Sequence, residues 1–235
     1  MIPFLHHLID YAGLFPPATL PLGEAIQHYA RYRQSAERWM LSRFIIPAPK
    51  LAALSEVAAE LFTENDPFVF SVLGRGGTSS DFLEGLQADL QAIDAFRQRH
   101  ASGVRLDVFE VRLPADALAL LEQTSDLLAA QQLRPFYEAT ISASWEQSIG
   151  ETIAAIAAHN QRGGPQAGFK LRCGGTEAAA FPSPQQVAYA IAACRDADIA
   201  MKATAGLHHP LRHHNESVQV KMHGFVNVFA ASLLA

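Results

Sequence analysis

The chain has 235 residues, of which 49% are hydrophobic and 17% charged, and its formal net charge is −5. This composition is typical of a globular protein with a sizeable core, and the negative charge argues against a nucleic-acid-binding protein, which normally carries a basic face. No run of about 18 apolar residues occurs, so no membrane span is expected. Cys173 and Cys194 are too few for a disulfide framework or a structural zinc site. Because the first residues also lack signal-peptide features, the sequence predicts a cytoplasmic protein.

Short apolar runs alternate with longer helical stretches along the whole chain. In chain order the sequence predicts a strand over 8–15, a helix over 22–33, a strand over 41–47, a helix over 51–62, a strand over 68–73, a helix over 81–99, a strand over 104–113, a helix over 116–131, a strand over 135–141, a helix over 145–159, a strand over 169–172, a helix over 183–195 and a strand over 199–204. In the helix over 81–99, apolar residues recur near the helical period of 3.6. The last stretch, HGFVNVFAASLLA over 223–235, is compatible with either a helix or a strand.

This regular alternation favours a parallel sheet with crossover helices. The glycine-containing turns GRGG, CGG and AGLHHP each follow a predicted strand, and in a (β/α)8 barrel such loops form the active-site face. We therefore expect one α/β domain over 1–235, a parallel (β/α)8 TIM-type barrel. Its eighth strand is missing, is formed by 223–235, or lies beyond residue 235. A doubly wound sheet is the alternative, but no GxGxxG motif follows the first strand, and no cofactor is expected.

Two lysines, Lys170 and Lys202, lie on neighbouring predicted strands, one βα unit apart. A lysine on the helix-facing side of a strand would be buried in apolar surroundings, so an inward orientation costs less. Two inward lysines raise the cost of charging each other, which favours one neutral amine. A neutral lysine amine attacks carbonyls and forms a Schiff base. The alternative is that each lysine reaches water or pairs with a carboxylate.

Five segments resemble, in order, strand-end motifs of the deoxyribose-phosphate aldolase family. They are LIDYAGLFPPAT, LDVFEV, PFYEAT, AGFKLRCGG and KATAG, and the fourth matches only with a one-residue gap before Lys170. The resemblance runs from residue 8 to about residue 208 and implies a class I aldolase barrel. It implies that Lys170 forms the Schiff base, that Lys202 tunes it, that Asp107 helps to shuttle a proton, and that Asp10 matches the first-strand aspartate.

The position of the proton-shuttling carboxylate stays open between two residues of one strand. Because strand side chains alternate, Asp107 and Glu110 point to opposite faces unless a β-bulge lies between them. Glu110 is nearer the carboxyl end of its strand, where the chemistry of a barrel normally lies. Both residues are therefore candidates.

The candidate substrate-binding residues depart from the family pattern. The Thr-Ser-Thr that follows the family's catalytic lysine is replaced by Leu171, Arg172 and Cys173, and the Gly-Ser-Ser turn of its phosphate site is absent. Arg172 shares a face with Lys170, and its planar fork suits a carboxylate. Its alternative role is an ion pair with Glu138 or Glu110. Glu138, Thr204 and Gly206 are further substrate-binding candidates, with Gly206 expected to allow close backbone approach to a ligand.

Four histidines, His208, His209, His213 and His214, follow the last predicted strand. A metal site needs ligands that converge from separate segments, and no H-E-x-x-H spacing is present, so no tightly bound metal is expected. His208 lies nearest the strand end and is the candidate for acid–base work or substrate binding. We expect it to face the site, and we expect His213 and His214 to be solvated.

Three hypotheses follow for the function. The first is a class I aldolase-like lyase that acts on a small anionic carbonyl substrate through Lys170, with Lys202 as its neighbour and Asp107 or Glu110 as proton shuttle. The second is a metal-dependent hydrolase or lyase with His208 or His209, Glu138 and Asp10 as ligands. The third is a degenerate barrel that binds without turnover. The expected partner is a small molecule, not nucleic acid or membrane, and an uncovered segment 223–235 would favour a homo-oligomer.

Overall fold

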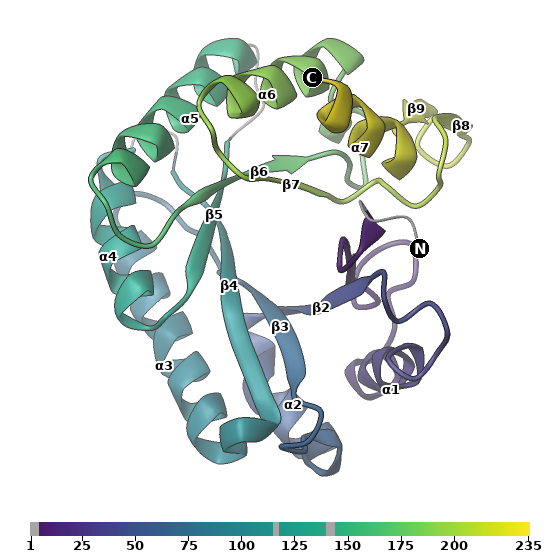
Figure 1. Ribbon diagram of the computed structural model, residues 1–235, viewed down its shortest axis with the longest axis vertical. Coiled ribbons are helices and arrows are strands. Elements are labelled where there is room, and N and C mark those ends of the chain that lie inside the picture. The colour runs from purple at the N-terminus through teal and green to yellow at the C-terminus, as the bar shows by residue number, and fades with distance from the viewer. Residues whose placement is uncertain (1–4, 115–117, 140–143) are drawn as a thin grey trace. The chain divides into compact units, whose positions relative to one another are not determined.

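The computed structural model describes residues 5–114, 118–139 and 144–235 (Figure 1). The chain divides into two compact units, Met1–Phe109 with Gln131–Leu133, and Glu110–Ala130 with Arg134–Ala235. The division falls inside one strand, β4 (Val104–Arg112), so that Glu110 and Arg112 belong to the second unit. The start of the predicted helix over 116–131 and the end of the predicted strand over 135–141 lie partly outside the described residues.

Seven strands form the main sheet, in the order in which they occur along the chain. They are β1 (Ile9–Tyr11), β2 (Leu41–Pro47), β3 (Phe68–Leu73), β4 (Val104–Arg112), β5 (Arg134–Glu138), β6 (Gly168–Arg172) and β7 (Met201–Thr204). The pairs β1–β2, β2–β3, β5–β6 and β6–β7 are parallel. The predicted α/β fold with a parallel sheet is therefore confirmed.

The first unit packs helices against one face of its strands. These helices are α1 (Leu22–Tyr32), α2 (Leu51–Ala58) and α3 (Phe82–His100), with short 3₁₀ turns η2 (Ala48–Lys50), η3 (Ala59–Leu61) and η4 (Ala101–Gly103). Phe44 of β2 contacts Tyr29 of α1, and Phe70 of β3 contacts Phe96 of α3. All four rings are buried. Side chains alternate between the two faces of a strand. Every second residue of these strands, among them Phe44 and Phe70, therefore faces the helices.

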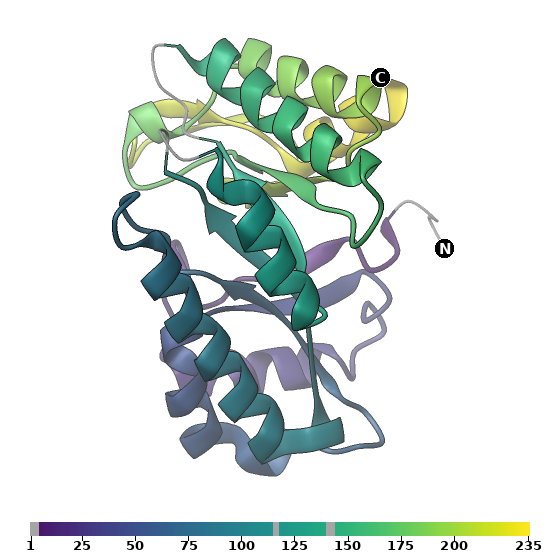
Figure 2. The ribbon, with the colours of Figure 1, turned by 90° about the vertical axis from the view of Figure 1, so that its left-hand side faces the viewer.

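The second unit repeats this arrangement with α4 (Leu120–Ala130), α5 (Trp145–Gln161) and α6 (Pro184–Asp196). Figure 2 shows α5 and α6 running side by side. The N-terminus of α6 is fixed by a capping box, in which Ser183 accepts from the backbone of Gln186 and the Gln186 side chain accepts from the backbone of Ser183. Tyr137 of β5 is buried and hydrogen-bonded to Ser125 of α4, at 2.7 Å, which identifies the helix-facing side of this strand.

The end of the chain differs from the sequence prediction. Segment 223–235 does not form a strand, because Phe225–Leu234 is a helix, α7, that packs against α6. A hairpin that the sequence did not predict precedes it: β8 (His213–Asn215) pairs antiparallel with β9 (Val220–Met222) as a separate sheet. Within the described ranges, therefore, no eighth strand joins the parallel sheet. None of the helices described is long and apolar enough to cross a membrane.

Candidate functional site

Three charged residues lie in a row across β5, β6 and β7. Glu138 is the register partner of Lys170, and Lys170 is the register partner of Lys202. Their strand neighbours Tyr137 and Phe169 are fully buried on the helix side. Because side chains alternate along a strand, the charged row occupies the opposite face. The spacing of one βα unit between the lysines therefore brings them side by side.

Glu110 lies between the two lysines. Its Oε2 is 3.1 Å from Nζ of Lys170, and its Oε1 is 2.5 Å from Nζ of Lys202. The Glu110 side chain is only 1% exposed. One buried carboxylate thus compensates two ammonium groups, which explains how two adjacent lysines are tolerated away from water.

Glu138 connects this group to a guanidinium. Its Oε2 is 3.1 Å from Nζ of Lys170, and its Oε1 accepts from Nε of Arg112 at 2.8 Å and also pairs with Nη2. Burial raises the pKa of Glu138, but Lys170 and Arg112 outweigh that effect, so the net pKa is lowered. Glu138 is therefore a carboxylate at neutral pH. We call Glu110, Arg112, Glu138, Lys170 and Lys202 the lysine–carboxylate cluster.

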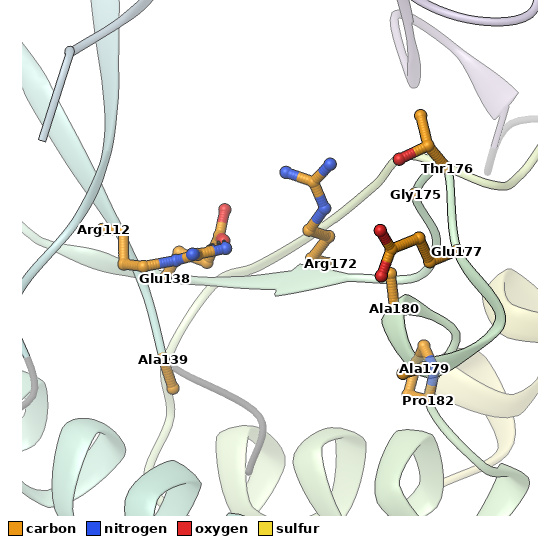
Figure 3. Close-up of a pocket in the computed structure, with 10 residues that line it drawn as sticks. All are labelled: Arg112, Glu138, Ala139, Arg172, Gly175, Thr176, Glu177, Ala179, Ala180 and Pro182. Carbon is orange, nitrogen blue, oxygen red and sulfur yellow. Dashed lines mark hydrogen bonds and ion pairs between the residues drawn. The ribbon is translucent and has the colours of Figure 1, made fainter.

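A cavity of about 350 Å³ adjoins this cluster (Figure 3). It is lined by Arg112, Glu138, Ala139, Arg172, Gly175, Thr176, Glu177, Ala179, Ala180 and Pro182. The ends of β4, β5 and β6 supply Arg112, Glu138 and Arg172, and Ala139 directly follows β5. The loop between β6 and α6 supplies the rest. Lys170 does not line the cavity itself; its amine lies behind the Glu138 carboxylate, which does.

Arg172 stands on β6 two residues after Lys170 and points into the cavity (Figure 3). Its Nε donates to the carbonyl oxygen of Gly174 at 2.8 Å. In the part of the chain that the structure describes, Nη1 and Nη2 of Arg172 make no hydrogen bond or ion pair. Neither alternative partner, Glu138 or Glu110, forms an ion pair with Arg172 in that part of the chain; these carboxylates pair with Arg112, Lys170 and Lys202.

The sequence singled out the CGG turn that begins the cavity loop, but not the polar residues that follow it. Thr176 and Glu177 are exposed and line the cavity, and Figure 3 shows the Glu177 carboxylate directed from the loop toward Arg172. The end of the loop is fixed by His223, a buried residue whose Nε2 lies 2.6 Å from the carbonyl oxygen of Pro182. Polar residues in an irregular loop carry no periodic signal, so nothing local in the sequence distinguished them.

The turn after β7 packs against the start of the loop after β6. The backbone oxygen of Thr204 accepts from the Cys173 amide at 2.7 Å. Gly206 has a φ of +66°, and a Cβ there would lie 2.6 Å from the carbonyl oxygen of Cys173. The close approach predicted at Gly206 is thus to the backbone of the neighbouring loop. Cys173 is buried, which raises its pKa to about 12, so it is a packed thiol.

The histidines lie on exposed turns and on the hairpin. His208 is exposed, and desolvation together with His209 and His213 lowers its pKa. The ring of His213 is half-buried against that of His209, at 4.1 Å between centroids, so His213 is only partly solvated. His214 is exposed as expected.

The described residues do not form a set of metal ligands. Across residues 5–114, 118–139 and 144–235, no group of three His, Cys, Asp or Glu side chains is placed to hold a metal ion. Glu138, one of the ligands in the second hypothesis, already pairs with Arg112 and Lys170.

The two remaining candidates, Asp10 and Asp107, lie in the first unit. Asp107 forms a bidentate pair with Arg43, at 2.7 and 2.9 Å, and Asp10 accepts from the Arg43 backbone amide at 2.8 Å. The structure therefore groups these aspartates around Arg43 and places Glu110 with the lysines.

The fold and cluster define an α/β protein with buried, compensated lysines on adjoining parallel strands, beside a polar cavity. No family model and no curated protein matches the chain. The chemistry of these residues is therefore the basis for a functional assignment.

Proposed function

We propose that the protein is a class I aldolase-like carbon–carbon lyase in which Lys170 forms a Schiff base with a small anionic carbonyl substrate. The contact that carries this proposal is the Glu110 carboxylate shared by the amines of Lys170 and Lys202. An ammonium must lose its proton before it attacks a carbonyl. A carboxylate within 3.1 Å of that ammonium is in reach to accept it.

Each residue of the cluster then has a distinct task. Lys170 supplies the nitrogen that bonds to the carbonyl carbon. Glu110 moves protons between the two amines, and Lys202 is the positively charged neighbour that shares this carboxylate with Lys170. Glu138, kept ionised by Arg112 and Lys170, is the second proton acceptor within 3.1 Å of the nucleophile. Glu110 takes the role that the family resemblance implied for Asp107, while Asp10 and Asp107 organise Arg43.

The barrel type of sheet is part of the same proposal. A doubly wound sheet reverses its strand order at a switch point, whereas the strands here follow the chain order from β1 to β7. That order supports the barrel type, with its eighth strand absent or atypical. A cytoplasmic location fits the proposed reaction, and the exposed Leu233 and Leu234 of α7 support association between copies.

Borohydride trapping tests the proposal. Incubation with pyruvate and sodium borohydride should attach one reduced adduct, which peptide mass spectrometry should locate at Lys170. Lys170→Arg should abolish the adduct, and Lys202→Met should slow its formation because the neighbouring positive charge is lost. The matched control is Lys50→Arg, which changes an exposed lysine and should trap like the wild type.

Two results would contradict the assignment. One is an adduct spread over exposed lysines such as Lys50 and Lys221 with none at Lys170. The other is a folded protein that traps no small aldehyde or ketone. Trapping at Lys170 without any cleavage or condensation product would favour the degenerate, non-catalytic barrel.

A further inference from the structure

We propose that the cavity beside the lysine–carboxylate cluster binds the carboxylate of its substrate at Arg172, and that the substrate is a hydroxylated 2-oxo acid, not a phosphate ester. This assignment deepens, and rests on, the Schiff-base function proposed for Lys170. It comes from the unused donors of Arg172, the charge of the cavity wall, and the acceptors on the β6–α6 loop.

The shape of the free donor group favours a carboxylate. Nε of Arg172 is held by Gly174, which fixes the plane of the guanidinium and leaves Nη1 and Nη2 facing the cavity (Figure 3). Two nitrogens in one plane match the two oxygens of a carboxylate. Arg112, the second arginine of the wall, is already committed to Glu138.

The charge of the wall disfavours a dianion. Arg112 and Arg172 contribute two positive charges, and Glu138 and Glu177 contribute two negative ones. A phosphate ester carries about −1.5 to −2 charges at neutral pH and three terminal oxygens, and it would lie beside two carboxylates with one uncommitted arginine. A carboxylate carries a single charge, which Arg172 alone balances.

The loop side of the cavity supplies acceptors for hydroxyl groups. The Glu177 carboxylate faces Arg172 across the cavity (Figure 3), and none of the described residues donates a hydrogen bond to it. The Thr176 hydroxyl lies beside it. A hydroxyl on a ligand held by Arg172 can donate to this exposed carboxylate, and the substrate of an aldol cleavage carries such a donor, the hydroxyl that becomes the aldehyde.

The reaction balances without any additional reactant. The Lys170 amine condenses with the C2 carbonyl of a 4-hydroxy-2-oxo acid and releases one water. The C4 hydroxyl loses its proton, the C3–C4 bond breaks, and its electron pair passes to the iminium nitrogen as an enamine. Protonation at C3 and hydrolysis by one water release the shorter 2-oxo acid, and the other fragment leaves as an aldehyde.

Trapping with two ketones separates this inference from the proposed function. Pyruvate carries the carboxylate, whereas acetone lacks it. Wild-type protein should trap pyruvate at Lys170 at least about tenfold faster than acetone, the factor that corresponds to about 1.4 kcal/mol. Arg172→Lys should remove most of this preference through a fall in pyruvate trapping, because the paired donors for the carboxylate are lost. The control Arg195→Lys alters an exposed arginine of α6 and should keep the preference.

The experiment gives different results if the carboxylate site at Arg172 is absent and if the Schiff base at Lys170 is absent. Equal trapping of pyruvate and acetone at Lys170 would overturn the carboxylate site and leave the Schiff base standing, whereas no trapping of either would end the Schiff-base function.

Ligand-induced thermal stabilisation of the wild type tests the same site without chemistry and without a variant. Glycerate, a hydroxylated carboxylate, should raise Tm more than inorganic phosphate at equal concentration. A larger shift with phosphate, or no shift with glycerate, would contradict the inference.

Glu177→Gln tests the hydroxyl contact through the split between binding and cleavage. Pyruvate release from 4-hydroxy-2-oxopentanoate should fall by about tenfold, a clearly larger loss than that of pyruvate trapping, because pyruvate has no C4 hydroxyl. Glu216→Gln, an exposed position on the hairpin turn, is the control. Equal loss of trapping and cleavage in Glu177→Gln would contradict a role at the hydroxyl.

Discussion

Glu110 is the residue on which the two lysines depend. Its carboxylate is buried and lies within 3.1 Å of one amine and 2.5 Å of the other. Removing one partner from a buried ionic group leaves uncompensated charge, which is far more destabilising than loss of a surface pair. The stability of the protein is therefore expected to depend strongly on the negative charge of the Glu110 side chain.

The first prediction concerns that charge. Glu110→Gln keeps the shape but removes the buried negative charge between the two amines, so the free energy of unfolding should fall by about 3–5 kcal/mol. Chemical denaturation measures the change. The double variant Glu110→Gln/Lys202→Met should recover part of the loss, because it also removes one of the two positive charges that Glu110 faced. A single variant within about 0.5 kcal/mol of wild type would show that the contact contributes little.

The second prediction follows from the lowered pKa of Glu138. Because its pKa in the folded protein lies below its ordinary value of 4.5, its ion pairs stabilise the fold above that pH. The stabilisation is lost as the pH falls through the lower, folded value. Between about pH 6 and pH 3, wild type should therefore lose more stability than Glu138→Gln, which cannot titrate.

Denaturation series at each pH measure this difference. Glu60→Gln, which alters an exposed side chain, should follow the wild-type curve. Parallel curves for wild type and Glu138→Gln would mean that the Glu138 pairs with Arg112 and Lys170 do not affect stability.

At the scale of elements, the loops after β6 and β7 hold each other by backbone contact. Gly206 approaches both Cys173 and Gly174 so closely that a Cβ would overlap them, at 2.6 and 2.9 Å. Its φ of +66° also disfavours other residues. These loops follow the strands that carry the two lysines, so their packing fixes the strand ends.

The third prediction separates the cost of steric overlap at Gly206 from the cost of its positive φ. Gly163 also has a positive φ, +79°, but a Cβ there would have no neighbour within 4 Å. Gly163→Ala should therefore cost only the backbone strain, about 1 kcal/mol, while Gly206→Ala should cost clearly more because of the overlap. Thermal unfolding of both variants provides the comparison, and equal losses would refute a packing role for Gly206.

At the scale of the whole molecule, local pattern accounts for most of the fold. The apolar runs placed all seven strands of the sheet and the helices between them, with β2 and β3 matching residue for residue. The hairpin β8–β9 was not predicted, because its strands, HHN and VKM, do not show a run of alternating apolar residues. Segment 223–235 was ambiguous because apolar runs of that length suit either structure.

Part of the candidate site could also be predicted from the sequence, and part could not. The spacing of one βα unit was enough to pair Lys170 with Lys202. Glu110 was a candidate as the proton shuttle, and the structure places it between the two amines. The partnership of Arg112 with Glu138 and the cavity-lining role of Glu177 depend on contacts between separate segments. Such contacts leave no periodic trace in one sequence, so only the structure revealed them.

The fourth prediction addresses the central claim, that Lys170 is a carbonyl nucleophile served by a carboxylate-binding cavity. A crystal structure of the protein reduced with borohydride in the presence of pyruvate tests it most directly. Continuous density should join Nζ of Lys170 to the ligand, with the ligand carboxylate on Nη1 and Nη2 of Arg172. Density for the ligand on another lysine, or an unmodified Lys170 still paired with Glu110 and Glu138, would contradict it.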